Sequence, residues 1–163
     1  MVRHAKSAWP EVPDHERPLG GRGRRDGPRA GRWLREGGYR PGHVVCSTAV
    51  RARQTWELVA GTLGGEPRVT YDPRLYAAEP EALLGVVAEE PADTATLLLV
   101  GHVPGVAGLT LGLAADADGD ALDRARAKFP TCAIAVLAVP GTWAELRPGT
   151  ARLTAFATPR RDF

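Results

Sequence analysis

Two arginines and two histidines in this sequence stand where the side chains of a parallel sheet can meet a ligand. Arg3 and His4 follow an opening run of two apolar residues, and His102 follows the strongly apolar run 97–100. Arg51 comes shortly after another apolar run. Because ligands bind beyond the carboxyl ends of the strands in open parallel sheets, we expect these four side chains to converge. Guanidinium groups offer paired donors that match phosphate oxygens, so the set predicts a phosphate site that contains both histidines.

The segments expected to position these residues alternate between strand and helix. Short apolar runs predict strands, and apolar residues at helical spacing predict helices. A helix is expected within 15–39, ending at Gly37 and Gly38, with Pro28 either starting or kinking it. The other predicted helices span 51–62, 79–89 and 103–113, and the predicted strands span 43–47, 68–71, 96–100, 133–139 and 151–156, the last at an edge of the sheet. This alternation predicts an α/β fold, a single-domain three-layer sandwich over residues 1–163 with a mostly parallel central sheet flanked by helices.

The opening of the chain is unusual for such a sheet. A central strand normally has about five or six residues, yet only Met1 and Val2 precede Arg3. The first strand is therefore expected to look truncated at its amino end.

Composition argues against several classes of protein. Of the 163 residues, 44% are hydrophobic and 25% are charged, which is typical of a folded domain, and the net charge is only +2. Neither nucleic acid nor a membrane is expected as a partner, no apolar run approaches the roughly 18 residues of a spanning helix, and a cytoplasmic location is expected. Cys46 and Cys132 lack a CxxC partner, which predicts free thiols. Frequent Ala, Gly and Arg indicate a GC-rich bacterial genome.

The remaining basic residues are expected to be solvated or structural. A nucleic-acid function for the Arg-rich stretch 17–40 is the least favoured, because few aromatic residues interleave with it. His15 is given no role. Ordinary positions on helix faces or at a strand start are expected for Arg22, Arg24, Arg25, Arg53 and His43.

Three motifs, in this order, resemble the histidine phosphatase superfamily: VRHAKS at 2–7, STAVRARQT at 47–55 and GHVPG at 101–105. The family's first motif is usually Arg-His-Gly, and here Ala5 takes the place of the glycine. That variant, the RPL at 17–19 and the compact length are similar to the small SixA-like phosphohistidine phosphatase branch. The resemblance covers nearly the whole chain, including FPTCAIAVLAV near its end, and implies a phosphoglycerate mutase-like fold.

The resemblance also implies roles for individual residues. His4 would be the nucleophile and phosphoryl carrier, and Arg3, Arg51 and His102 would form the phosphate pocket, with Ser7 as a further phosphate-binding residue. Neutral imidazole can attack phosphorus in line while arginines and a second, protonated histidine hold the other oxygens. Water then hydrolyses the phosphohistidine. No metal or other cofactor is expected, because the fixed cations of the pocket do what magnesium would do.

A general acid is harder to assign. Larger members of the superfamily use a carboxylate from a mid-chain insertion, and the corresponding region here, 71–84, is short. The candidates are Glu79 and Glu81, which open a helix, and Asp14 and Glu16, which lie in the loop before RPL. A weak or absent acid suits a leaving group that departs easily, such as imidazole. The favoured substrate is therefore phosphohistidine in a protein partner.

Two alternatives stay open. One is a small-metabolite or aryl phosphomonoesterase of the same superfamily, with Glu79 or Glu81 supplying the acid and a small phosphate ester as substrate. The other is a non-catalytic phosphate-binding domain, which the short first strand makes conceivable.

Overall fold

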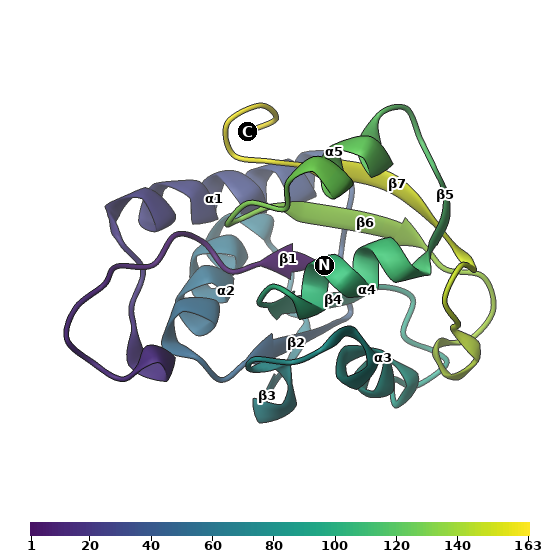
Figure 1. Ribbon diagram of the computed structural model, residues 1–163, viewed down its shortest axis with the longest axis horizontal. Helices are drawn as coiled ribbons and strands as arrows, with labels where there is room; N and C mark the ends of the chain where they lie inside the picture. The colour runs from purple at the N-terminus through teal and green to yellow at the C-terminus, as the bar shows by residue number, and fades with distance from the viewer.

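A seven-stranded sheet runs through the centre of the computed structural model, which describes residues 1–163 (Figure 1). The strands lie in the order β3-β2-β4-β1-β6-β7-β5. Pairing is parallel from β3 to β1 and between β5 and β7, and antiparallel on both sides of β6. Their bounds are β1 Val2–Arg3, β2 His43–Ser47, β3 Arg68–Asp72, β4 Leu97–Gly101, β5 Ala114–Ala117, β6 Ile134–Ala138 and β7 Ala151–Ala157. The predicted, mostly parallel sheet is confirmed.

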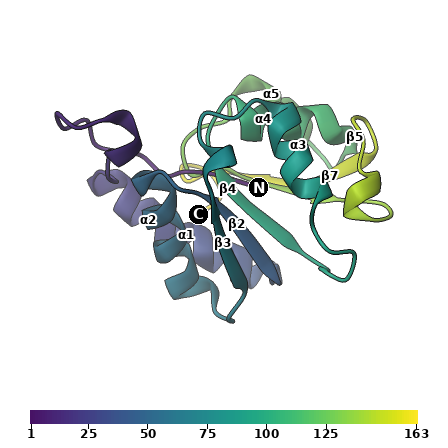
Figure 2. The same cartoon turned by 90° about the horizontal axis from the view of Figure 1, so that it is seen from below.

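Helices cover both faces of this sheet (Figure 2). Helices α1 and α2 lie on one face, and α3, α4 and α5 lie on the other. None of these helices is long and apolar enough to cross a bilayer. Their bounds are α1 Gly21–Glu36, α2 Val50–Leu63, α3 Pro80–Ala88, α4 Gly105–Leu113 and α5 Ala121–Ala127, with short 3-10 turns at Asp14–Glu16, Pro73–Leu75 and Trp143–Glu145.

Side chains of the central strands point alternately to the two faces of the sheet, so each face has its own part of the hydrophobic core. In β2, Val44 and Cys46 pack with residues of α1 and α2, whereas Val45 packs with residues of α3 and α4. All five residues of β2 are buried, as expected for an apolar strand covered on both sides. The apolar runs thus form the middle layer, and their carboxyl ends are fixed by core packing. Cys46 and Cys132 are buried free thiols, as predicted.

Helices α1 and α2 approach each other closely through glycine. A Cβ added at Gly31 would lie 2.3 Å from the carbonyl oxygen of Val59, so only glycine fits there. Thr62 Oγ1 donates a hydrogen bond to the carbonyl of Pro28 at 2.8 Å across the same contact. Pro28 lies inside α1 rather than at its start. This contact fixes α2, which carries Arg51 in its first turn.

The strand β7 is not at the edge of the sheet, so that prediction was wrong. Strand β5 pairs with it in parallel and forms the edge instead. The sequence of β5 is AADA, and neither its β propensity nor its pattern indicates a strand. Helix α5, directly after it, was missed as well.

The first strand is short, as expected. Val2 and Arg3 pair with Val100 and Gly101 of β4, and Val2 pairs with Ile134 of β6. A mostly apolar cavity of about 480 Å³ is lined in part by residues of β4 and β6. The register of β1 nevertheless places His4 beside the end of β4.

Candidate active site

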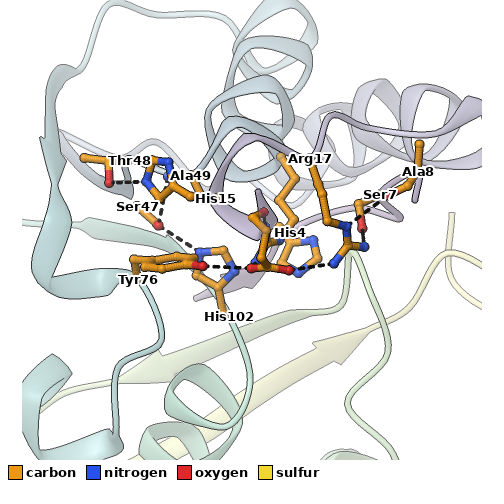
Figure 3. A network of polar contacts seen from close by, with 12 residues as sticks. His4, Ser7, Ala8, His15, Arg17, Ser47, Thr48, Ala49, Tyr76 and His102 are labelled. Atoms are coloured by element: carbon orange, nitrogen blue, oxygen red, sulfur yellow. Dashed lines mark hydrogen bonds and ion pairs between the residues drawn. The ribbon is translucent and has the colours of Figure 1, made fainter. Parts of the chain in front are cut away.

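The carboxyl ends of three neighbouring parallel strands bring the predicted residues together. His4 follows β1, His102 follows β4, and β2 ends in Ser47. Because β1 and β4 are parallel neighbours, the two histidine rings approach to 5.0 Å between centroids, with 50° between their planes. Figure 3 shows His4 between His102 and Tyr76 on one side and Arg17 on the other. The two histidines meet, as the sequence predicted.

His4 is held in one orientation by the neighbouring strand and helix. Its backbone N–H donates to the carbonyl of Gly101, and the N–H of Ala5 donates to Thr55 Oγ1, both at 2.9 Å. Ring Nδ1 lies 2.7 Å from the carbonyl oxygen of Ala5. Because a carbonyl only accepts hydrogen bonds, Nδ1 carries the proton and Nε2 keeps its lone pair. Burial, assisted by the charge of Arg51, lowers the pKa of His4 to about 4, so the imidazole is neutral at pH 7.

His102 is also a neutral imidazole. Burial, assisted by His4 and Arg51, lowers the pKa of His102 to about 3. Its Nε2 lies 2.8 Å from Ser47 Oγ, and its buried Nδ1 has no hydrogen-bond partner. Burial and the surrounding cations both oppose a positive charge on His102, so the predicted protonation of this second histidine depends on the negative charge of a phosphoryl group and stays a prediction.

Two arginines converge on the carboxylate of Asp14. Arg51 donates to Asp14 Oδ2 at 3.0 Å and to its backbone carbonyl at 2.6 Å. Arg17 donates to Asp14 Oδ1 at 2.8 Å, to Ser7 Oγ at 2.6 Å and to the carbonyl of Ala8 at 3.1 Å. Both arginine side chains are largely buried. Ser7 was predicted to bind phosphate, but in this geometry its hydroxyl accepts from Arg17 and holds that guanidinium in place.

Arg3 is anchored by the segment that follows α5. Its Nη1 donates to the carbonyl of Phe129 at 2.7 Å, while its buried Nε has no partner. Burial lowers the pKa of Arg3, but an arginine stays charged near neutrality. The guanidinium therefore keeps donor capacity for an anion beside His4.

Asp14 occupies an anion's position within this set of donors. Tyr76 donates to Asp14 Oδ2 at 2.8 Å. Hydrogen bonds from Tyr76, Arg17 and Arg51 hold the pKa of Asp14 well below its usual range. The carboxylate is therefore ionised and, in this arrangement, has no proton to donate near pH 7.

The other acid candidates make no ion pair or side-chain hydrogen bond with the arginines or histidines of the site. Glu16, Glu79 and Glu81 are exposed, and the ion pairs of Arg17 and Arg51 are both with Asp14 instead. Of the four predicted candidates, the structure brings only Asp14 to the arginines.

Sequence reasoning missed three residues that complete the pocket. Arg17 was noted only as part of the RPL motif, yet it is buried and lies under the ring of Trp9, 3.3 Å from the centroid. Tyr76 packs edge-on against His102, with centroids 5.6 Å apart. His15 packs edge-on against Tyr76 at 4.8 Å, and its Nε2 lies 2.9 Å from Thr48 Oγ1. The RPL motif was the only signal for any of them, because Tyr76 and His15 reach the pocket from irregular segments.

The arrangement suits phosphoryl transfer. A neutral, oriented imidazole faces a set of arginine donors, which can hold three phosphoryl oxygens while the fourth ligand of phosphorus is exchanged. No cluster of three or more His, Cys, Asp or Glu side chains that could hold a metal ion is found. The fold and the site thus define a phosphoryl-transfer protein with a histidine at its centre.

Comparisons with known proteins give the family. The model of the histidine phosphatase superfamily (branch 1) matches residues 1–85. The chain belongs to this superfamily and is a hydrolase of the phosphatase class. Its relatives include the uncharacterized protein Rv1276c of Mycobacterium tuberculosis, 44% identical over 162 residues, and the uncharacterized protein ML1117 of Mycobacterium leprae, 39% identical over 165 residues. Each alignment covers 98% of this chain and 100% of the relative.

Solved structures share the whole fold. The proposed phosphohistidine phosphatase SixA of Nakamurella multipartitia is 36% identical, with a TM-score of 0.83 over 97% of this chain and 93% of that one. The corresponding SixA protein of Agrobacterium tumefaciens is 28% identical, with a TM-score of 0.77 over 97% and 95% of the two chains. The protein histidine phosphatase SixA complexed with tungstate is 23% identical and has a TM-score of 0.73 over 98% and 95%, which supports the fold alone. The phosphoglycerate mutase-like fold implied by the motifs is confirmed.

Proposed function

We propose that this protein removes phosphate from phosphohistidine in a protein partner, through a phosphohistidine intermediate on His4. The observation that carries the proposal is the pairing of a neutral, oriented His4 with arginines and with a carboxylate that has no proton to give. The similarity to structures named as proposed phosphohistidine phosphatases supports it.

In the first step, Nε2 of His4 attacks phosphorus and the bond to the substrate's imidazole breaks. Arg3, Arg17 and Arg51 hold the phosphoryl oxygens as charge moves, and this stabilisation is the main contribution expected from the protein. The incoming dianion takes over the donors that Asp14 holds in the structure. The leaving nitrogen is protonated from solvent, so no positioned acid is required.

In the second step, water attacks phosphorus, the bond to His4 Nε2 breaks and inorganic phosphate is released. His102 helps to hold the phosphoryl group when its imidazole is protonated. A phosphoryl dianion beside His102 favours the imidazolium and raises its pKa, so His102 becomes a cationic donor when phosphate is bound.

The expected substrate preference follows from the lack of a protonated general acid in the proposed site. An alkyl phosphate expels an alkoxide, which needs a positioned proton, whereas imidazole leaves without one. We expect kcat/KM to decrease from a phosphohistidine protein, through p-nitrophenyl phosphate, to a sugar phosphate. The test measures all three under one set of conditions.

An alternative function is favoured by one feature, the placement of Asp14 at the arginines. If a bound ester raised its pKa, Asp14 could protonate an alkoxide and the protein would be a phosphomonoesterase for small metabolites. The variant Asp14→Asn separates the two functions. Loss of sugar phosphate hydrolysis alone, together with a preference of the wild type for that substrate, would establish the alternative. The proposal predicts that Asp14→Asn keeps its activity on phosphohistidine and binds inorganic phosphate more tightly.

A further inference from the structure

A basic cleft opens beside the proposed phosphate site. It has a volume of about 580 Å³, and no carboxylate is among its 13 lining residues. Seven of those residues are cations: Arg3, Lys6, Arg22, Arg124, Lys128, Arg160 and Arg161. This concentration of one sign of charge is unexpected for a chain with a net charge of only +2.

Some of these cations are neutralised by nearby carboxylates. Arg124 pairs with Asp162 at 2.5 Å, and Arg161 pairs with Asp120 at 3.3 Å. Arg22 lies 3.4 Å from Asp26. The pairs of Arg124 and Arg161 join α5 and its first residues to the C-terminal turn, which lies beside α5 in Figure 1, whereas the pair of Arg22 lies within α1. They build the wall of the cleft.

The other cations of the cleft have no carboxylate partner. Lys6, Lys128 and Arg160 are exposed and form none of the protein's ion pairs, and Arg3 donates to a backbone carbonyl only. They come from three separate segments of the chain, so the free charges are spread along the cleft. Unneutralised charges of one sign in a concave surface attract and orient an oppositely charged partner.

Arg3 links the cleft to the proposed catalytic pocket, because it lines the cleft and directly precedes His4 in the chain. Arg3 lines the cleft and also contributes positive charge that lowers the pKa of His4. Lys6 is two residues from His4. A molecule whose phosphoryl group is bound at His4 would therefore lie close to the basic surface.

We propose that this cleft binds acidic side chains of the protein that carries the phosphohistidine, and that Lys6, Lys128 and Arg160 select that partner. The inference rests on the proposed function. The free cations are exposed side chains spread over three segments, which fits a broad acidic protein surface. A compact small polyanion would instead require converging, buried donors, such as those of Arg17 and Arg51.

The first test is kinetic. The triple variant Lys6→Ala, Lys128→Ala, Arg160→Ala is compared with a control of equal charge change, Arg29→Ala, Arg32→Ala, Arg35→Ala, in which all three residues are exposed on α1 and outside the cleft. We expect the cleft variant to raise KM for a phosphohistidine protein about tenfold, as for the loss of several steering charges, with kcat and the hydrolysis of p-nitrophenyl phosphate little changed. The control should behave as the wild type does. Equal KM values in the two triple variants would overturn the inference.

The second test does not depend on turnover. A fluorescent decaglutamate peptide is titrated with each protein, and tripolyphosphate is used as a competitor. The wild type and the control should bind the peptide in a salt-sensitive manner, and the cleft variant should not. If the peptide binds in this way but no phosphohistidine protein is turned over, the proposed function fails while the acidic-surface site stands. Peptide binding that is unaffected in the cleft variant would overturn the site as one for an acidic protein, and so would tripolyphosphate binding that is tighter than peptide binding and is lost in the cleft variant.

Discussion

Individual buried arginines supply the positive charge that stabilises the proposed transition state. Arg51 is largely buried and points two nitrogens at one residue, Asp14, which is the forked geometry that also matches a phosphoryl group. His4 needs such donors because its own imidazole is neutral. The chemistry therefore depends on guanidinium groups with fixed positions and not on net charge.

Replacing Arg51 should lower activity strongly. We expect Arg51→Ala to lose about 10²–10³ in kcat/KM, as for the removal of one transition-state donor. Arg51→Lys should recover only part of this, because a point charge cannot replace a bidentate fork. Steady-state kinetics with p-nitrophenyl phosphate measure both variants. Full activity of Arg51→Lys would mean that charge alone suffices.

The secondary structure elements show how far sequence reasoning can reach. The strand predicted at 43–47 is β2, because a short apolar run after a turn suits a strand that is covered on both faces. The meeting of His4 with His102 followed from the strand-end rule for parallel sheets. Strand β5 was missed because its AADA sequence is ordinary in composition and is a strand only through its pairing with β7.

The loops of the site could not be predicted in the same way. Arg17 and Tyr76 both contact Asp14, but Tyr76 is 62 residues away from it in the chain. No periodicity encodes such a contact, since it depends on where the sheet places two irregular segments. Sequence reasoning therefore found the residues at strand ends and missed those that surround them.

The contact between α1 and α2 gives a prediction at the level of elements. Gly31→Ala should lower the free energy of unfolding by more than about 2 kcal/mol, since the added Cβ overlaps backbone and α2 must shift. Gly61→Ala is the matched control, because a Cβ there meets nothing within 4 Å. That control should be neutral or stabilising by up to about 1 kcal/mol. Urea denaturation distinguishes them, and equal stability of the two variants would mean that the helices are not in this close contact.

For the molecule as a whole, the two buried histidines make the free energy of unfolding depend on pH. His4 and His102 have pKa values of about 4 and about 3 in the folded protein, against 6.5 for an ordinary histidine. Between those values the unfolded chain binds more protons than the folded one, so stability falls as pH decreases below 6.5. It stops falling on account of these two groups only below their folded pKa values.

This dependence can be measured by comparing the wild type with the double variant His4→Asn, His102→Asn between pH 5 and pH 7. Each histidine should contribute about 1.4 kcal/mol of lost stability for each pH unit below 6.5. The wild type should therefore have the steeper slope, and other groups titrate alike in both proteins. Parallel slopes would show that the two histidines titrate normally.

The most direct measurement of the proposed chemistry is the identification of the phosphorylated residue. The protein is mixed with a radiolabelled phosphohistidine protein, quenched in base within milliseconds, digested and mapped. We predict an acid-labile, base-stable phosphoryl group on His4, absent from His4→Ala, with the phosphate released into solution at the rate of turnover. Turnover at the wild-type rate by His4→Ala, or a label on any other residue, would contradict it.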